Sequence, residues 1–183
     1  MFKKVCIIGC GLIGSSLARA IKEKNLAEKI VSSNRLEATN KKVIELNIVD
    51  DSSSDTKKMV EGSDLIIIAT PLSSYEAVIL KIKDHIKHDS ILTDVGSVKE
   101  KVIALVEKNL PKNVSWIPSH PIAGTEESGP EAGFSKLFQN RWCILTPSKT
   151  AKKKDISLLK NFWETIGSKV DTMDPIEHDY ILS

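Results

Sequence analysis

One stretch near the N-terminus decides how this chain folds: Val5-Cys6-Ile7-Ile8-Gly9-Cys10-Gly11-Leu12-Ile13-Gly14. Residues 5–8 form a continuous apolar run, which is typical of a parallel strand buried on both faces. The glycines that follow have the spacing of the dinucleotide-binding turn, in which they permit the bend, the approach of a pyrophosphate and close packing of helix on strand. A pyrophosphate would rest on the unpaired amides where the next helix begins, at Leu12 and Ile13. The alternative is a turn with a purely structural role.

Beyond this stretch the chain alternates between predicted strands and predicted helices. Apolar runs predict strands near residues 29–34, 65–69, 91–94, 115–118, 141–147 and 169–173, and most of them are separated by apolar residues at helical spacing. This pattern predicts an α/β fold, a Rossmann-type doubly wound sheet that is mostly parallel.

Composition narrows the classes of function. The chain has 183 residues and a net charge of +2 with both signs interspersed, which gives no indication of nucleic acid or a membrane surface as a partner. Its three cysteines lack the spacing of metal ligands, so no metal is expected. No apolar run has the length of a signal peptide or a membrane span, and we expect a cytoplasmic protein.

The end of the second predicted strand bears on the choice of cofactor. NAD-binding sites usually place an acidic residue about twenty positions beyond the glycines, where it accepts a hydrogen bond from the ribose. This chain has Ser32-Ser33-Asn34-Arg35 instead. The serines and Asn34 could donate to a 2′-phosphate and Arg35 could pair with it, which favours NADP over NAD. In the alternative interpretation Arg35 is solvated and Asn34 caps the next helix.

Polar or small residues follow three later predicted strands, and ligands bind at the carboxyl ends of strands in an open α/β sheet. We therefore expect these residues to meet near the nicotinamide: Thr70 and Pro71, Asp94 to Ser97, and Ser119 with His120. An imidazole with an ordinary pKa near 6.5 suits removal of a hydroxyl proton while hydride leaves the same carbon, so His120 is the predicted base; a structural role is the alternative. Residues 121–140 lack periodicity and predict a long functional or mobile loop.

The last residues predict a helix that stops early. Asp174-Pro175-Ile176-Glu177 combines an N-cap, a first-turn proline and a first-turn acid, and only six residues follow. This suggests a fragment, with a dinucleotide-binding domain at 1–173 and, at 174–183, the start of an interdomain helix leading to an absent domain.

Taken together, the motifs resemble those of prephenate and arogenate dehydrogenases, the oxidoreductases of tyrosine biosynthesis. The resemblance covers essentially the whole chain and rests on Gly9 to Ser16, Asp94 to Lys99 and Ser119-His120-Pro121-Ile122-Ala123-Gly124-Thr125-Glu126. It implies that a C-terminal helical dimerisation domain is missing here, which in the full-length protein would form a homodimer and complete the substrate site.

The resemblance also implies an activity. The reaction would be oxidative decarboxylation of prephenate to 4-hydroxyphenylpyruvate with hydride transfer to NADP or NAD. His120 would take the proton of the substrate hydroxyl, Ser97 would bind the same hydroxyl or orient His120, and Glu126 would shape or gate the pocket, unless it is merely a solvated loop carboxylate.

Several alternatives stay open. Arogenate, which would give tyrosine, is a second possible substrate, and a β-hydroxyacid or imine reductase is a rival enzyme on the same cofactor domain. The chain could also be a nucleotide-binding module without catalysis.

Overall fold

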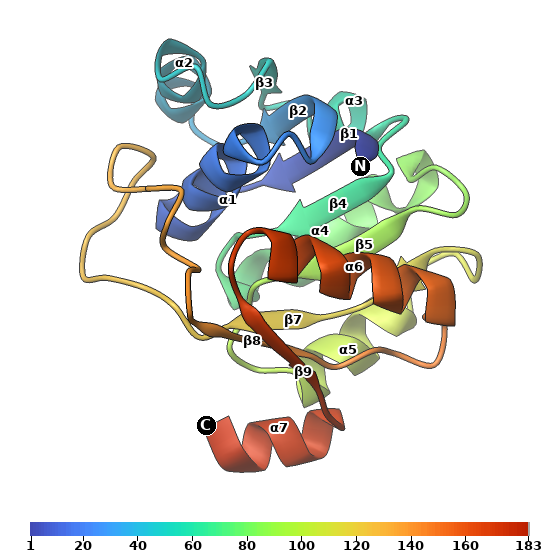
Figure 1. The fold of residues 1–183 in the computed structure, drawn as a ribbon. Helices are drawn as coiled ribbons and strands as arrows, with labels where there is room; N and C mark the ends of the chain where they lie inside the picture. Colours follow the sequence, from blue (N-terminus) through green and yellow to red (C-terminus); the bar gives the residue numbers. More distant parts are fainter. Residues whose placement is uncertain (183) are drawn as a thin grey trace.

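The structure is a computed structural model that describes residues 1–182. Its main sheet has six parallel strands in the order β3-β2-β1-β4-β5-β6 (Figure 1). The bounds are β1 (Phe2–Ile8), β2 (Ala27–Ser33), β3 (Asp51–Ser53), β4 (Leu65–Ile68), β5 (Ile91–Asp94) and β6 (Ser115–Trp116). The strand order reverses between β1 and β4, which is the place where doubly wound sheets bind ligands. The predicted α/β fold with a Rossmann-type parallel sheet is confirmed.

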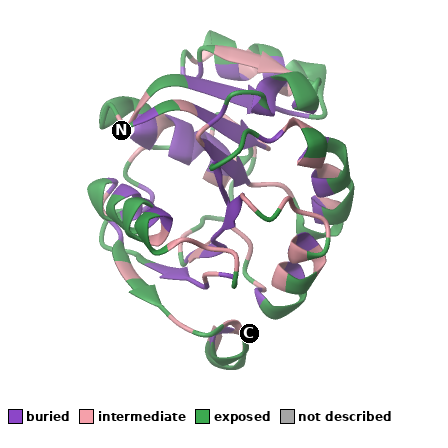
Figure 2. Cartoon of the chain, turned by 90° about the vertical axis from the view of Figure 1, so that its right-hand side faces the viewer, coloured by how far each residue is buried: buried purple, intermediate pink, exposed green. Residues whose placement is uncertain are grey.

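Helices cover both faces of this sheet because its central strands are apolar on both sides. Leu65 and Ile67 of β4 pack into one core and Ile66 and Ile68 into the other, and all four are fully buried. Figure 2 shows the buried residues concentrated in the strands between the helices. The helices are α1 (Leu12–Glu23), α2 (Glu37–Glu45), α3 (Thr56–Val60), α4 (Tyr75–Ile82), α5 (Glu100–Glu107), α6 (Lys153–Thr165) and α7 (Pro175–Leu182), with two short 3-10 turns, η1 (Leu72–Ser74) and η2 (Lys83–His85).

A second, three-stranded sheet follows β6 in the chain. It consists of β7 (Ser119–Pro121), β8 (Trp142–Leu145) and β9 (Lys169–Thr172), with β7 antiparallel and β9 parallel to β8. The structure therefore places His120 inside a strand, opposite Ile144, and corrects its expected position beyond the end of a parallel strand. The reason is Pro118, which has no N–H with which to continue the ladder along β5, so that the chain leaves the main sheet.

The sequence interpretation missed β3 and α3. β3 has only three residues, Asp51-Ser52-Ser53, and no apolar run to announce it. It forms because its backbone continues the ladder of β2, where Ser32 pairs with Ser52. Such an edge strand is set by its neighbour rather than by its own residues.

Helix α7 begins as expected. The carboxylate of Asp174 accepts hydrogen bonds from the amides of Ile176 and Glu177, at 2.9 and 3.4 Å, and so acts as its N-cap. Residue 183, which the proposed interdomain segment 174–183 includes, lies outside the described residues. Within residues 1–182 there is no helix both long and apolar enough to span a membrane.

Candidate functional site

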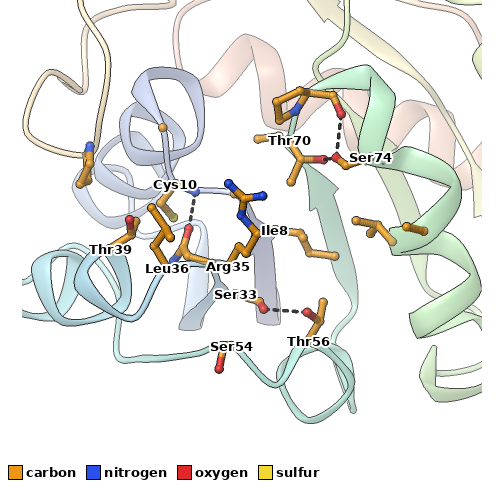
Figure 3. A pocket seen from close by; sticks show the side chains of 18 of the residues that line it. Ile8, Cys10, Ser33, Arg35, Leu36, Thr39, Ser54, Thr56, Thr70 and Ser74 are labelled. Carbon is orange, nitrogen blue, oxygen red and sulfur yellow. Dashed lines mark hydrogen bonds between the residues drawn. The ribbon is translucent and has the colours of Figure 1, made fainter.

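A cavity of about 660 Å³ opens at the carboxyl ends of β1, β2 and β4, and we refer to it as the main cavity. Figure 3 shows the side chains around it. The predicted cofactor residues that line it are Gly9, Gly11, Ser33, Asn34, Arg35, Thr70 and Pro71. The cavity therefore lies between β1 and β4, where the order of the strands reverses, and next to Gly11, which precedes α1.

The first and third glycines hold the turn that shapes this cavity. A Cβ atom on Gly14 would lie 2.0 Å from the carbonyl oxygen of Gly9 and 3.2 Å from the side chain of Ile7. Gly9 itself adopts a positive φ of 95°. The helix can thus approach the strand only with glycine at position 14. The N-terminus of a helix favours an anion, because its first amides have no partner within the helix. Such close packing of helix on strand, which needs a glycine without a Cβ atom, is found in the turns that bind dinucleotides.

We expect the third and second glycines to respond differently to substitution. Gly14→Ala should destabilise the unliganded chain by about 1–3 kcal/mol, because the added methyl group overlaps backbone. Gly11→Ala should leave stability nearly unchanged, since nothing lies within 4 Å of a Cβ there, yet weaken nucleotide binding by covering the approach to the backbone. Urea denaturation and calorimetric titration would measure the two effects separately. Equal stability losses in both variants would contradict this account of the turn.

Asn34 has a different role from the one expected. Its Oδ1 accepts a hydrogen bond of 2.6 Å from the amide of Cys10, and its Nδ2 donates to Asn40 Oδ1 at 3.0 Å and to Ser52 Oγ at 3.3 Å. Only 6% of Asn34 is exposed. The amide therefore ties the glycine turn to β3 and α2 and is not free to donate to a phosphate. It does not cap α2 either, because the residue before that helix is Leu36.

The two serines of β2 are engaged in the same way. Ser32 is fully buried and hydrogen-bonded to Ser52 at 2.7 Å, and Ser33 donates to Thr56 at 2.9 Å. Arg35, labelled in Figure 3, is exposed and lines the main cavity. Lys81 of α4 is also exposed and lines it. The residues that line the cavity include no carboxylate. Its electrostatic character is therefore cationic.

The loop between β7 and β8 closes one side of the cavity. It contains no helix or strand, as expected, and Gly129 and Pro130 line the cavity. Arg19 of α1 donates to the carbonyl of Pro130 at 3.0 Å, and the amide of Phe134 donates to Ser16 Oγ at 3.1 Å. The second half of the loop is thus anchored on α1.

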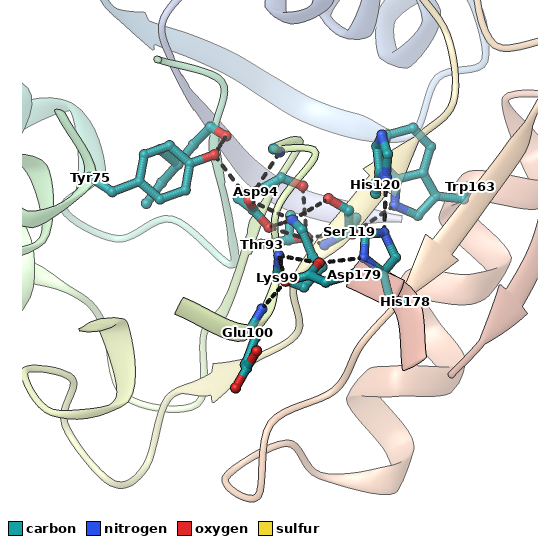
Figure 4. Close-up of polar contacts among 12 residues, drawn as sticks. Tyr75, Thr93, Asp94, Lys99, Glu100, Ser119, His120, Trp163, His178 and Asp179 are labelled. Atoms are coloured by element: carbon teal, nitrogen blue, oxygen red, sulfur yellow. Dashed lines mark hydrogen bonds and ion pairs between the residues drawn. The ribbon is translucent and has the colours of Figure 1, made fainter. Parts of the chain in front are cut away.

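His120 does not line the main cavity, and its Nδ1 makes a 2.9 Å hydrogen bond with Nε2 of His178 on α7 (Figure 4). Burial, His178 and the ammonium of Lys99 lower the pKa of His120 to about 4, against the opposing effect of Asp94 and Asp179. The imidazole is therefore neutral at pH 7, with a lone pair on one of its ring nitrogens.

The structure also changes the role expected of Asp94, which was to lie near the nicotinamide. Its carboxylate is fully buried and does not line the main cavity; it pairs with the equally buried Lys99 at 2.7 Å. It also accepts hydrogen bonds from Tyr75 Oη at 2.9 Å and from the amide of Ser119 at 3.1 Å. Lys99 donates in turn to the carbonyl of Ser119 at 2.9 Å. The pair fixes the backbone next to His120, which explains why its oxygens are not directed at a cofactor.

The remaining predicted residues lie apart from these contacts. Leu12 and Ile13 belong to the first turn of α1 and do not line the main cavity. Ser97 and Glu126 are exposed, and neither side chain has a hydrogen bond to His120 among the described residues. The side chain that hydrogen-bonds His120 in the structure is His178.

Sequence reasoning did not find the roles of Lys99, His178 and Asp179. A lysine two residues beyond the predicted Ser97 and a His-Asp pair directly after a helix start were visible in the chain. Neither signal indicates which distant residue contacts these side chains, so the sequence does not reveal their hydrogen bonds.

The fold and the main cavity define a nucleotide-binding domain of the Rossmann type. A family model for the nucleotide-binding domain of prephenate dehydrogenase matches residues 17–172. The chain belongs to the prephenate/arogenate dehydrogenase family, whose nucleotide-binding domain it comprises.

Individual relatives agree with this assignment. The chain is 37% identical over 183 residues to cyclohexadienyl dehydrogenase of Zymomonas mobilis and 33% identical over 181 residues to prephenate dehydrogenase of Bacillus subtilis. These alignments cover 100% and 98% of this chain but 62% and 48% of the relatives. The chain therefore spans about half to three fifths of the length of these proteins.

Two solved structures are also similar. Prephenate dehydrogenase from Aquifex aeolicus, in complex with hydroxyphenyl propionate and NAD+, is 30% identical with a TM-score of 0.91, covering 99% of this chain and 63% of that chain. Synechocystis arogenate dehydrogenase is 27% identical with a TM-score of 0.90, covering 97% of this chain and 62% of that chain.

Proposed function

We propose that the protein to which this chain belongs is a prephenate dehydrogenase of tyrosine biosynthesis, which converts prephenate to 4-hydroxyphenylpyruvate with hydride transfer to NADP or NAD. The observation that supports it most is the half-buried imidazole of His120, hydrogen-bonded to His178, within a nucleotide-binding domain of this family. Residues 1–173 form the cofactor domain in this proposal, and residues 174–183 lead into a helical domain that completes the substrate site and forms a homodimer.

The chain's own residues would hold the cofactor in the main cavity. The amides at the start of α1 would bind the pyrophosphate, with Gly9 and Gly11 allowing close approach. Arg35 and Lys81 stand at the edge of the cavity and would bind further negative charge. The nicotinamide, when bound, supplies the acceptor for a hydride.

The reaction assigns one role to His120. The substrate carries a ring hydroxyl, and its O–H proton passes to the imidazole as the hydride leaves the same carbon, so that a carbonyl forms there. Loss of carbon dioxide from the opposite ring carbon then supplies the electron pair that makes the ring aromatic, and the oxygen, now a phenolate, takes the proton back to give the phenol. Ser97 and Glu126 are proposed to contact the substrate from the exposed face.

The experiment that tests this function compares two substrates in the full-length protein. Formation of reduced cofactor is followed with prephenate and with arogenate. Reduction that depends on prephenate supports the proposal, and a preference for arogenate makes the protein an arogenate dehydrogenase that produces tyrosine. If the full-length protein binds nucleotide but oxidises neither compound, a nucleotide-binding module without catalysis is the better description.

The proposal favours NADP, and of Ser32 to Arg35 the preference rests on Arg35, which is exposed at the main cavity. Arg35→Ala should weaken NADP binding about 10- to 100-fold, because a charge-assisted contact with a phosphate contributes about 1.5–3 kcal/mol, and leave NAD binding unchanged. Calorimetric titration of the 183-residue chain measures both affinities. Arg141→Ala is the control, since Arg141 is exposed and does not line the main cavity.

An opposite result would identify the other cofactor. If the chain binds NAD more tightly and Arg35→Ala changes neither affinity, the dehydrogenase proposal stands with NAD. NAD+ is the cofactor in the Aquifex structure.

A further inference from the structure

Three side chains from two distant parts of the chain form a continuous series of hydrogen bonds, which we call the histidine chain: Asp179, His178 and His120. Asp179 Oδ1 lies 2.8 Å from Nδ1 of His178, and Nε2 of His178 lies 2.9 Å from Nδ1 of His120. Figure 4 shows the three in sequence at the boundary of α7 and the second sheet. The two rings meet edge-on, with planes 61° apart.

We propose that His178 and Asp179 are positioning residues that hold His120 in the tautomer with a proton on Nδ1 and a free lone pair on Nε2. This inference rests on the proposed function of His120 as the base and deepens it. It names which nitrogen accepts the substrate proton and which residues select it.

The carboxylate of Asp179 decides which nitrogen donates in each hydrogen bond of the histidine chain. The amides of Glu100 and Lys99 donate to its carboxylate at 2.9 Å each, and together with His178 they lower the pKa of Asp179, outweighing the effect of burial, which raises it. An ionised carboxylate only accepts, so Nδ1 of His178 must be the donor. Nε2 of the same ring then accepts from Nδ1 of His120, at 2.9 Å. Nε2 of His120 is then left as the basic nitrogen, and it has no hydrogen-bond partner among residues 1–182.

The surroundings make this arrangement rigid. His178 is fully buried, and its backbone amide bonds to the carbonyl of Asp174 at 2.9 Å in the first turn of α7. Asp179 is fixed by the two amides at the start of α5. When Nε2 of His120 takes a proton, the Nδ1–H bond to His178 is retained, and the carboxylate compensates the new charge across the intervening ring. No proton has to leave His120 along the histidine chain.

Nitrogen-15 NMR of the 183-residue chain at neutral pH tests the tautomer without any turnover. In the unaltered chain we expect Nδ1 of His120 to be protonated and Nε2 unprotonated. His178→Phe keeps a ring but removes the acceptor, and should shift His120 to the Nε2–H form. His178→Gln restores an acceptor and should restore the Nδ1–H form. A His120 that carries its proton on Nε2 in the unaltered chain, or that is indifferent to His178→Phe in a folded chain, overturns the proposal.

Kinetics of the full-length protein supply the second measurement. We expect His178→Phe and Asp179→Asn to lower kcat about 100-fold with the KM for the cofactor unchanged, and His178→Gln to recover most of the loss. Glu177→Gln is the matched control, because Glu177 is exposed on the same helix and loses the same charge as Asp179→Asn. Unchanged kcat in His178→Phe overturns the positioning role. If NMR gives the expected tautomers but the full-length protein oxidises no substrate, the proposed function fails and the tautomer assignment stands.

Discussion

Replacing His120 by asparagine should reduce kcat of the full-length protein about 10²- to 10⁴-fold, the range that a positioned general base contributes. Asparagine keeps a polar side chain but has no nitrogen that can take a proton at neutral pH. Since His120 does not line the main cavity, the affinity for NADP and NAD should stay as it was. Steady-state kinetics and calorimetric titration of the same preparation measure the two quantities.

A matched control for this substitution is His88→Asn. His88 is exposed and lies just before β5, at the amino end of that strand and not at the carboxyl end, where Asp94 lies. We expect it to leave kcat and nucleotide affinity unchanged. Near-normal turnover in His120→Asn would show that another group removes the proton.

The second large effect should come from the buried ion pair. Lys99→Met should lower the free energy of unfolding by about 3–5 kcal/mol, because Asp94 is then left in the interior without its counter-charge. The lysine also holds the carbonyl of Ser119, so the strand that carries His120 should lose order as well. Urea denaturation of the 183-residue chain measures the stability.

Two further variants test whether the loss of stability comes from the unpaired charge of Asp94. Lys101→Met changes an exposed lysine on the same helix and should alter stability by less than about 0.5 kcal/mol. Adding Asp94→Asn to Lys99→Met removes the uncompensated charge and should recover part of the loss. If Lys99→Met alone were as stable as the unaltered chain, the ion pair would have no structural role.

The features that the sequence predicted correctly are those with local causes. The glycine turn, the apolar strands and the cap at Asp174 each depend on residues a few positions apart, and the structure contains all of them. The Rossmann-type sheet followed from these signals because parallel strands require helical crossovers.

The features that the sequence did not predict depend on contacts between residues that are far apart in the chain. Asn34 has an amide that could bind a phosphate, but its hydrogen bonds go to the glycine turn and to β3, whose strand no local signal announces. His178 lies 58 residues from His120, and Asp179 lies 80 residues from Lys99. The pairing of such groups is decided by packing, which the spacing of residues in the sequence does not report.

The separation between His120 and His178 has a consequence during synthesis. A ribosome adds roughly 5–20 residues per second, so His178 is polymerised several seconds after His120. The glycine turn and the strands beside it are complete well before that, and N-terminal parts generally fold first. The nascent chain can therefore build its nucleotide cavity while His120 still lacks its partner, and the imidazole can bond to His178 only when α7 docks.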